Sequence, residues 1–333
     1  MSRWQIPPRD PVGVSVVRLR ELESVTERRI RDQHVVSKVI LRGFAAPGHG
    51  GKGWMLTPFD VCVGREMRPR GLAGCGRVPD LLMCAAESAE QLWNAEVETH
   101  LGPAIEAARD GHLHDQDAHV AAIRDGIALH LVRSLRYLEV NRAAVAQTIE
   151  NVRRTAPVAR RELLEAEFQR RHGLVAAGPE ALATLLEEPL ATWRSLDEKG
   201  VIARAGIEAM FRRVRDTLRP LEVEVWHVPP GYELLISDSP ALAFRYSGDH
   251  MRIQVNVAVG DASGIALPLA RDCLAVIGPQ PKDEELLPSN VEVLNRLQVQ
   301  EARQYVYYHP SGRLKAFVQE AIPPAARAPS VPT

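Results

Sequence analysis

Three side chains near the start of the chain, His34, Lys38 and Arg42, follow one another at intervals of four residues. An α-helix turns by about 100° per residue, so residues four and eight apart lie along one side of it. Val39 and Ile40 fall on the opposite side, as expected of a helix packed on a core. One imidazole and two cations in a row can bind an anion or take part in acid–base catalysis. The alternative is the solvated cationic face of an amphipathic helix.

A second polar group follows an apolar run in the last third of the chain. Residues 234–236 are Leu-Leu-Ile, and they end in Ser237, Asp238, Ser239 and Pro240. Side chains at strand ends leave the core and become available to a pocket. Asp238 is therefore a candidate general base, metal ligand or partner that orients His34, and Ser237 a candidate ligand-binding group. The alternative is a turn aspartate that accepts backbone N–H bonds.

Two further sets of polar residues occur on expected helices. Asn295 and Gln298 lie about one helical turn apart, so they can present their amides jointly to a ligand or to a sheet edge. Arg133 lies on the same predicted helix as His130, and carboxylates such as Glu98 lie on the preceding one. An arginine buried beside a cleft is a candidate phosphate or carboxylate site, whereas an exposed one forms an ordinary surface ion pair.

The first motif resembles that of a bacterial family known as domain of unknown function 4238 (DUF4238). Members of this family open with His-x-Val-Pro-x-x-x-Leu-Arg-x-Phe, and residues 34–44 are similar to it except for Ser37 in place of proline. Serine also suits the beginning of a helix, as its cap. Residues 234–240 and 291–308 resemble later segments of the same family. The resemblance marks positions of interest but implies no reaction, because the family itself has no assigned activity.

Other candidate motifs are less specific. His112, His114, Asp115, Asp117 and His119 are potential metal ligands, but they fit no known ligand spacing, and a turn in which Asp115 or Asp117 caps the next helix explains them. The Arg124 to His130 segment resembles the Arg-and-His element of the HEPN ribonucleases, with a partly buried His130 and a surface Arg124 as the alternative. The Gly-rich turn before Lys52 is no phosphate loop, because Gly53 follows the lysine.

The elements that must position these residues follow from the sequence pattern. We expect a tail and charged helix over residues 1–30, the first motif and a helical bundle over 31–220, an antiparallel sheet with one late helix over 221–320, and a disordered tail over 321–333. Glycines and prolines divide the helical region into five or six helices, at Gly111, Pro157, Gly173, Pro179, Pro189 and Gly200, and Pro220 closes it. Strands are then expected over residues 223–227, 232–236, 242–246, 253–259 and 273–277. Helices that precede strands in this way predict an α+β fold.

Composition limits the classes of partner. The formal net charge is −1, so nothing global favours nucleic acid, and carboxylates interleave the basic stretches. The sequence shows no signal peptide and no run long enough to span a membrane. Four cysteines without metal-ligand spacing are typical of reduced thiols in a cytoplasmic protein. The sequence leaves both the cofactor and the oligomeric state undetermined.

Two functions remain open. In the first, His34, Lys38, Arg42, Asp238, Asn295 and Gln298 converge in a pocket for a small anionic, phosphorylated or nucleotide-like ligand, with His34 and Asp238 as catalytic residues of a hydrolase or nuclease-type effector. In the second, the same residues form a buried polar network that holds a non-enzymatic protein together.

Overall fold

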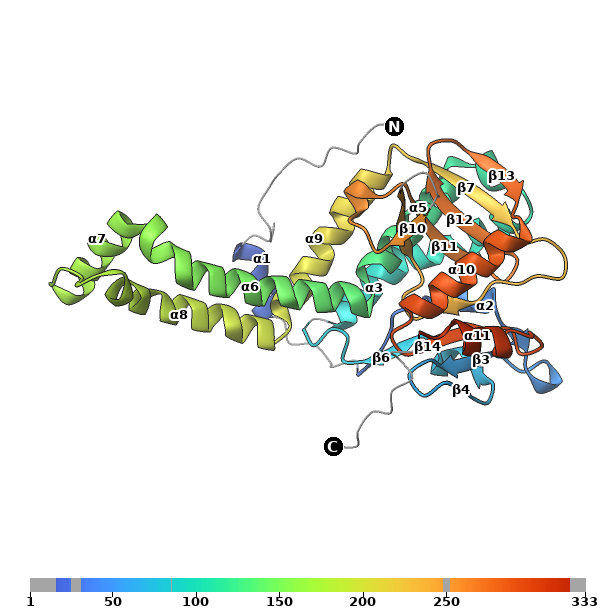
Figure 1. Cartoon of the computed structure of the whole chain (residues 1–333), viewed down its shortest axis with the longest axis horizontal. Helices are drawn as coiled ribbons and strands as arrows, with labels where there is room; N and C mark the ends of the chain where they lie inside the picture. The colour runs from blue at the N-terminus through green and yellow to red at the C-terminus, as the bar shows by residue number, and fades with distance from the viewer. Residues whose placement is uncertain (1–15, 25–30, 85, 248–251, 324–333) are drawn as a thin grey trace.

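The computed structural model describes residues 16–24, 31–84, 86–247 and 252–323, and Figure 1 shows a broad body with a long helical arm on one side. The body contains the sheets and the helices that cover them. The chain is an α+β protein, with its helices in the middle and most of its strands in the C-terminal half, as the sequence predicts.

The helical region begins after residue 85 and ends before the larger sheet. A π-helical segment, Asn94–Glu98, joins the first two of its helices. The α-helices up to this sheet are α1 (Val16–Ser24), α2 (Lys38–Arg42), α3 (Ala86–Trp93), α4 (Thr99–Arg109), α5 (Asp117–Val132), α6 (Leu135–Ala159), α7 (Arg161–His172), α8 (Pro179–Glu198) and α9 (Val201–Leu218). The later helices are α10 (Pro288–Glu301) and α11 (Lys315–Ala321), and short 3-10 turns cover His49–Gly51, Leu72–Gly74, Leu113–Asp115 and Val259–Asp261.

The predicted helix boundaries are partly right. Gly173 and Gly200 follow helix ends in the left-handed conformation, which glycine adopts without steric strain. Pro179 is the first residue of α8, where its missing N–H removes no hydrogen bond. Pro157 and Pro189 were predicted to end helices, but they lie inside α6 and α8. Packing between these two helices keeps both of them continuous through the prolines.

The larger sheet has six strands in the order β10-β9-β11-β12-β7-β13. Its neighbouring strands are antiparallel except for β7 and β13, which are parallel. The strands are β7 (Glu222–His227), β9 (Leu242–Ser247), β10 (Arg252–Val255), β11 (Gly264–Ala270), β12 (Cys273–Gly278) and β13 (Lys282–Glu285). Alternation predicts β7, β9 and β12, but β11 is buried throughout and contains Pro268, so it shows no period of two.

The second sheet joins distant parts of the chain. Its order is β2-β3-β14-β8, and β4 and β5 also pair with β3. These strands are β2 (Ala46–Pro47), β3 (Trp54–Asp60), β4 (Arg65–Glu66), β5 (Arg70–Gly71), β8 (Ile236–Ser237) and β14 (Tyr305–Tyr308). Because β3 lies within 31–220 and pairs with β14 from 221–320, the N-terminal and C-terminal regions share one sheet. A separate two-stranded ribbon pairs β1 (Asp32–His34) with β6 (Arg77–Pro79).

Helix α5 connects the helices of the body with the larger sheet. It packs against α4 and α9 as well as β7 and β11. Its buried side chains include Ile123, Ile127 and Leu129, and the facing sheet residues Val223 and Val225 are also fully buried. This apolar contact fixes the end of α5, where His130 and Arg133 lie.

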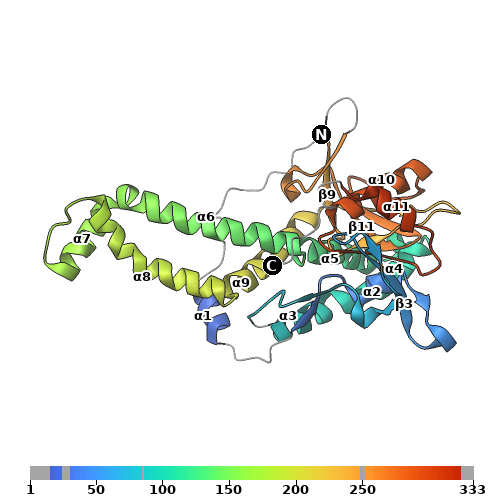
Figure 2. The same cartoon turned by 60° about the horizontal axis from the view of Figure 1, so that its bottom comes forward.

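The predicted bundle has two parts. Helices α3, α4, α5 and α9 belong to the body, whereas α6 and α8 run side by side away from it, with α7 at the far end (Figures 1 and 2). Two small apolar clusters hold the arm together: one joins Leu164, Leu182 and Leu185, and the other joins Val145 and Leu196 to residues of α1 and α9. The arm therefore has little core of its own.

Several terminal predictions lie partly outside the described residues. Helix α1 occupies part of the predicted segment 1–30, but residues 1–15 and 25–30 are not described. Residues 324–333 of the predicted tail 321–333 are not described either. No helix in the described ranges combines the length and hydropathy that crossing a bilayer requires. All four cysteines are free thiols.

Candidate functional site

The first motif is only partly helical. His34 is the last residue of β1, and α2 begins four residues later at Lys38. Only Lys38 and Arg42 share the helix, so the predicted row of three side chains on one helix is wrong. Pairing of β1 with β6 sets the backbone at His34. Arg42 is exposed, and its guanidinium lies 4.9 Å from the centre of the Trp54 ring.

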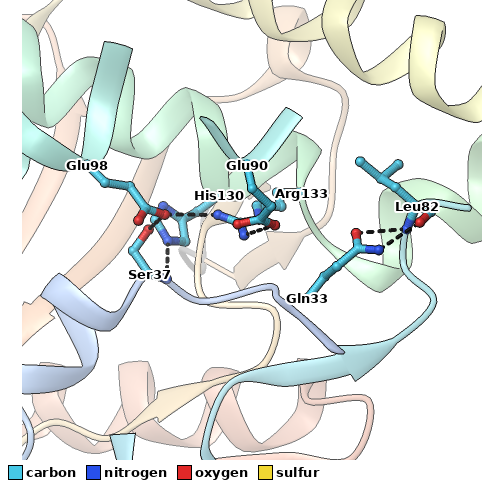
Figure 3. A network of polar contacts seen from close by, with 7 residues as sticks. All are labelled: Gln33, Ser37, Leu82, Glu90, Glu98, His130 and Arg133. Atoms are coloured by element: carbon cyan, nitrogen blue, oxygen red, sulfur yellow. Dashed lines mark hydrogen bonds and ion pairs between the residues drawn. The ribbon is translucent and has the colours of Figure 1, made fainter. Parts of the chain in front are cut away.

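Ser37 precedes α2 but does not cap it with its side chain. Instead, its backbone N–H donates a hydrogen bond to Nε2 of His130 at 3.1 Å, and its hydroxyl donates one to Oε1 of Glu98 at 2.7 Å (Figure 3). Ser37 therefore connects the first motif to two helices of the body.

The π-helical segment orients two glutamates of the α3–α4 helix. In a regular α-helix, residues eight apart, such as Glu90 and Glu98, differ by about 80° around the axis. A π turn contains one extra residue, so Glu90 and Glu98 are oriented nearly as residues seven apart in a regular α-helix would be. Such residues differ by only about 20° around the helix axis. Thr99 donates both its N–H and its hydroxyl to the carbonyl of Asn94, five residues earlier. Both carboxylates consequently face the end of α5.

Arg133 lies between these two carboxylates and is fully buried. Its Nη1 atom donates to Glu98 at 2.9 Å and its Nη2 atom to Glu90 at 2.5 Å (Figure 3). Its guanidinium also lies 4.7 Å from the centre of the Trp93 ring. A planar guanidinium can bridge two carboxylates and stack on an aromatic ring at the same time. We call Ser37, Glu90, Glu98, His130 and Arg133 the Arg133 cluster.

The two glutamates differ in acidity although they share one arginine. Burial raises the pKa of the Glu90 carboxyl, and the attraction of Arg133 only partly offsets this effect. Burial acts on Glu98 in the same direction, but Arg133 and the hydrogen bond from Ser37 outweigh it, so the pKa of Glu98 is lowered. Glu98 is therefore the carboxylate that neutralises Arg133 most firmly, and Glu90 the one that takes up a proton more readily.

His130 is neutral and fully engaged. Burial lowers its pKa to about 4. Its Nδ1 atom lies 2.7 Å from the carbonyl oxygen of Gly126, to which it donates, because Nε2 accepts the N–H of Ser37. Both ring nitrogens are thus occupied within the protein, and His130 is a structural residue.

His34 and Lys38 border the Arg133 cluster. Partial burial, together with the nearby charges of Lys38 and Arg133, lowers the pKa of His34 to about 4. The Nε2 atom of His34 is buried and has no hydrogen-bond partner among the described residues. Lys38 is exposed, and no ion pair to it is formed by the described residues. Lys38 is therefore open to solvent, whereas the Nε2 atom of the half-buried His34 lies beneath the surface beside it.

Gln33 anchors the strand that carries His34. Its amide donates to the carbonyl of Leu82 at 2.6 Å and accepts the N–H of the same residue at 3.0 Å (Figure 3). A reciprocal pair of this kind fixes both the position and the rotation of β1.

Asp238 belongs to a different network. Its two carboxylate oxygens accept the backbone N–H groups of Arg303, Gln304 and Tyr305 at 2.7 to 2.9 Å. The residue is buried, and burial raises its pKa despite these hydrogen bonds. No hydrogen bond or ion pair links Asp238 with His34 in the described part of the chain. Asp238 therefore holds the turn between α10 and β14.

Asn295 and Gln298 bind the free edge of β8. Asn295 accepts the N–H of Leu235 and donates to the carbonyl of Glu233. Gln298 accepts the N–H and the hydroxyl of Ser237 and donates to the carbonyl of Pro240. Since β8 pairs with β14 on its other side, the two amides take the place of a further strand.

With this geometry in view, the chain was compared with known proteins. No protein-family model, curated protein or solved structure matches it. The resemblance of the three motifs to DUF4238 therefore remains a prediction.

The predicted site residues thus lie in three separate places. His34, Lys38 and Arg133 lie at or beside the Arg133 cluster, Ser237, Asp238, Asn295 and Gln298 form the β8 network, and Arg42 stacks on Trp54. Sequence reasoning missed Glu90, because its alignment with Glu98 depends on a π turn for which the sequence has no clear signal.

The remaining candidates have structural roles. Arg124 pairs with Glu222 at 3.4 Å, away from the hydrogen bonds of His130, so the two do not form a ribonuclease pair. His112 pairs with Asp115 inside the turn before α5, and neither Asp115 nor Asp117 caps that helix, since Gln116 holds this position. Within the described ranges, no group of three or more His, Cys, Asp or Glu side chains is arranged to hold a metal ion.

Proposed function

We propose that the chain binds a small anionic ligand, such as a phosphate ester or a nucleotide, between His34 and Lys38 at the edge of the Arg133 cluster. The observation that carries this proposal is the buried Nε2 atom of His34, which has no partner and lies near the cations Lys38 and Arg133. Buried polar atoms are normally hydrogen-bonded, and a ligand is one way to complete such a site.

The chemistry of the two side chains suits an anion. A phosphate oxygen would accept a hydrogen bond from His34 and would neutralise Lys38, whose charge no described carboxylate pairs with. Arg133 adds positive charge behind them, although Glu90 and Glu98 compensate much of it. Selectivity for anions would thus depend mainly on Lys38 and His34.

Hydrolysis of a bound phosphoester is a further step of the same proposal. It requires a proton donor or acceptor close to the ligand, and Asp238 is engaged by three backbone N–H groups. Glu90 is the better candidate, because it lies close enough to Lys38 for their charges to interact and burial raises the pKa of its carboxyl.

Calorimetric titration with inorganic phosphate and with adenosine monophosphate at low ionic strength tests the proposal. Lys38→Met and His34→Ala should each weaken phosphate binding about ten-fold, the loss of one charge-assisted hydrogen bond. Lys52→Met and His114→Ala remove exposed residues of the same types elsewhere and should leave it unchanged. Equal affinities in all five proteins would contradict an anion site at this place.

Turnover distinguishes binding from hydrolysis. With p-nitrophenyl phosphate as substrate, a hydrolase working through Glu90 should lose activity in Glu90→Gln while Asp238→Asn keeps it. Binding without turnover in the wild-type protein would limit the proposal to a binding function.

The second candidate function is purely structural. The closed hydrogen bonds of Asp238, Asn295 and Gln298 favour it, because every one of these groups is satisfied by the protein itself. Failure to bind phosphate or nucleotide at His34 would leave this function as the better account.

A further inference from the structure

A pocket of about 460 Å³ lies between the larger sheet and α10, separate from both polar networks. Its volume falls within the range of about 300–1,000 Å³ that is common for small-molecule sites. Most of its wall is apolar, and it includes Trp226, Phe244, Leu274, Val276, Leu294 and Leu297. An organic molecule with an apolar body would fit this wall.

One carboxylate belongs to the lining. Glu224 is only 8% exposed, although it is on a wall of apolar side chains. Within the described part of the chain, its carboxylate accepts one hydrogen bond, from the indole N–H of Trp226 at 3.2 Å. No described lysine or arginine forms an ion pair with it. A carboxylate needs a cation or several donors to offset its desolvation, so Glu224 retains the capacity to bind a cation.

Two glycines make room for these groups on the sheet. A Cβ atom on Gly278 would lie 2.0 Å from Oε1 of Glu224, and one on Gly264 would lie 2.8 Å from Cζ of Phe244. Both distances are too short for any larger residue without displacement of these side chains. The position of the Glu224 carboxylate over the sheet therefore depends on Gly278.

The nearest cation from a neighbouring strand does not neutralise Glu224. Lys282 is paired with Glu224 in the register of β13 and β7, but its Nζ atom lies 5.6 Å from the centre of the Trp226 ring and forms no ion pair with the carboxylate. Trp226 thus contacts Lys282 on the neighbouring strand β13 and Glu224 on its own strand β7.

We propose that this pocket binds a small organic amine, whose ammonium group pairs with Glu224 and whose apolar body lies against Trp226, Phe244 and Leu294. An ammonium group supplies the donors that the carboxylate lacks, and the apolar wall excludes water from the pair. This site is independent of the anion site at His34, and it requires a ligand of the opposite charge.

Three probes that differ only in their polar group test the proposal on the full chain: 4-phenylbutylamine, 4-phenylbutanol and 4-phenylbutyrate. Binding is measured by calorimetry and by the fluorescence of Trp226, with Trp226→Phe to identify its contribution. The amine should bind about ten-fold more tightly than the alcohol, the value of one hydrogen bond to a charged group. The carboxylate should bind most weakly.

Two variants test whether Glu224 causes the preference for the amine, and a third tests the pocket itself. Glu224→Gln should abolish the advantage of the amine over the alcohol, whereas Glu285→Gln, which removes an exposed acid of β13 that pairs with His227 and not with Trp226, should preserve it. Val293 is 41% exposed on α10 at the pocket, so Val293→Trp should narrow the pocket and weaken all three probes without disturbing the core.

Each remaining result overturns the proposal. Equal affinities for amine and alcohol in the wild-type protein would exclude the role of Glu224, as would an amine preference that persists in Glu224→Gln. Absence of binding by all three probes, or binding that Val293→Trp does not change, would exclude the pocket itself.

Discussion

The backbone N–H of Ser37 donates a hydrogen bond to Nε2 of His130, 93 residues further along the chain. This bond requires an unprotonated nitrogen, so it holds His130 in the neutral form with its proton on Nδ1. The segment that carries His34 and Lys38 is thereby attached to the end of α5, beside Arg133.

The stability of the protein should decrease between about pH 6.5 and pH 4. The pKa of His130 is about 4 in the folded protein and close to 6.5 in an unfolded chain. As the pH falls through this interval, the unfolded state takes up a proton that the folded state does not. His130 alone would remove up to about 3 kcal/mol from the free energy of unfolding, and His34 acts in the same direction.

Urea unfolding at pH 7 and pH 5 measures this effect. His130→Gln keeps a hydrogen-bond acceptor but does not titrate. The free energy of unfolding should therefore fall less between pH 7 and pH 5 than in the wild-type protein. His114→Gln, at an exposed site, should behave like wild type. Glu90 and Asp238 act in the opposite direction at the acidic end of this interval. Their pKa values are raised in the folded protein, so the folded state takes up these protons more readily than the unfolded state does. An unchanged loss in His130→Gln would refute the assignment.

Arg133→Lys should destabilise the protein by about 2–4 kcal/mol, because a single ammonium cannot bridge Glu90 and Glu98 while stacking on Trp93. Arg136→Lys is the matched control. Arg136 is 38% exposed and pairs with Glu301, so its replacement should change stability by less than about 1 kcal/mol. Thermal unfolding of both variants gives the comparison, and similar losses would show that burial of Arg133 has no energetic consequence.

Asp238→Asn should lower stability by about 2 kcal/mol while phosphate affinity at His34 stays the same. An amide offers one acceptor oxygen, and its NH₂ group would face backbone N–H groups that the carboxylate now satisfies. Asp261→Asn, at an exposed position, serves as the control. A stable Asp238→Asn protein that no longer binds phosphate would instead support the predicted pairing of Asp238 with His34.

The side-chain amides of Asn295 and Gln298 on α10 should protect different backbone N–H groups, and hydrogen exchange measures each of these groups separately. Asn295→Ala should speed exchange at the N–H of Leu235, and Gln298→Ala should do so at Ser237, because each side chain accepts one of these protons. Loss of one hydrogen bond corresponds to about ten-fold faster local exchange. If both variants accelerated both positions equally, β8 would open as a unit and the separate roles would be incorrect.

Regular patterns in the sequence predicted much of the fold. Strands β7, β12 and β14 alternate or carry aromatic residues, and the glycines at 173 and 200 follow helix ends. Strand β13 escaped prediction because its Lys-Asp-Glu-Glu sequence has no apolar face, and it forms only as a charged edge beside β7. The helical arm could not be foreseen, since the amphipathic pattern of α6 does not say which helix covers it.

The candidate site was harder to predict for a physical reason. Arg133 is buried only because Glu90 and Glu98, on another helix, both face it, and their alignment arises from the π turn. Motif residues such as Asp238 and Gln298 looked reactive because of their types. Their hydrogen bonds to backbone groups become visible only when α10 and β8 are placed together.

The pKa of His34, followed by NMR on histidine-labelled protein with and without inorganic phosphate, shows whether an anion binds beside this residue. We predict a pKa of about 4 in the free protein and a clear increase when phosphate binds, because an anion stabilises the imidazolium form. The increase should be smaller in Lys38→Met. A His34 signal whose pKa does not respond to saturating phosphate would contradict an anion site at this residue.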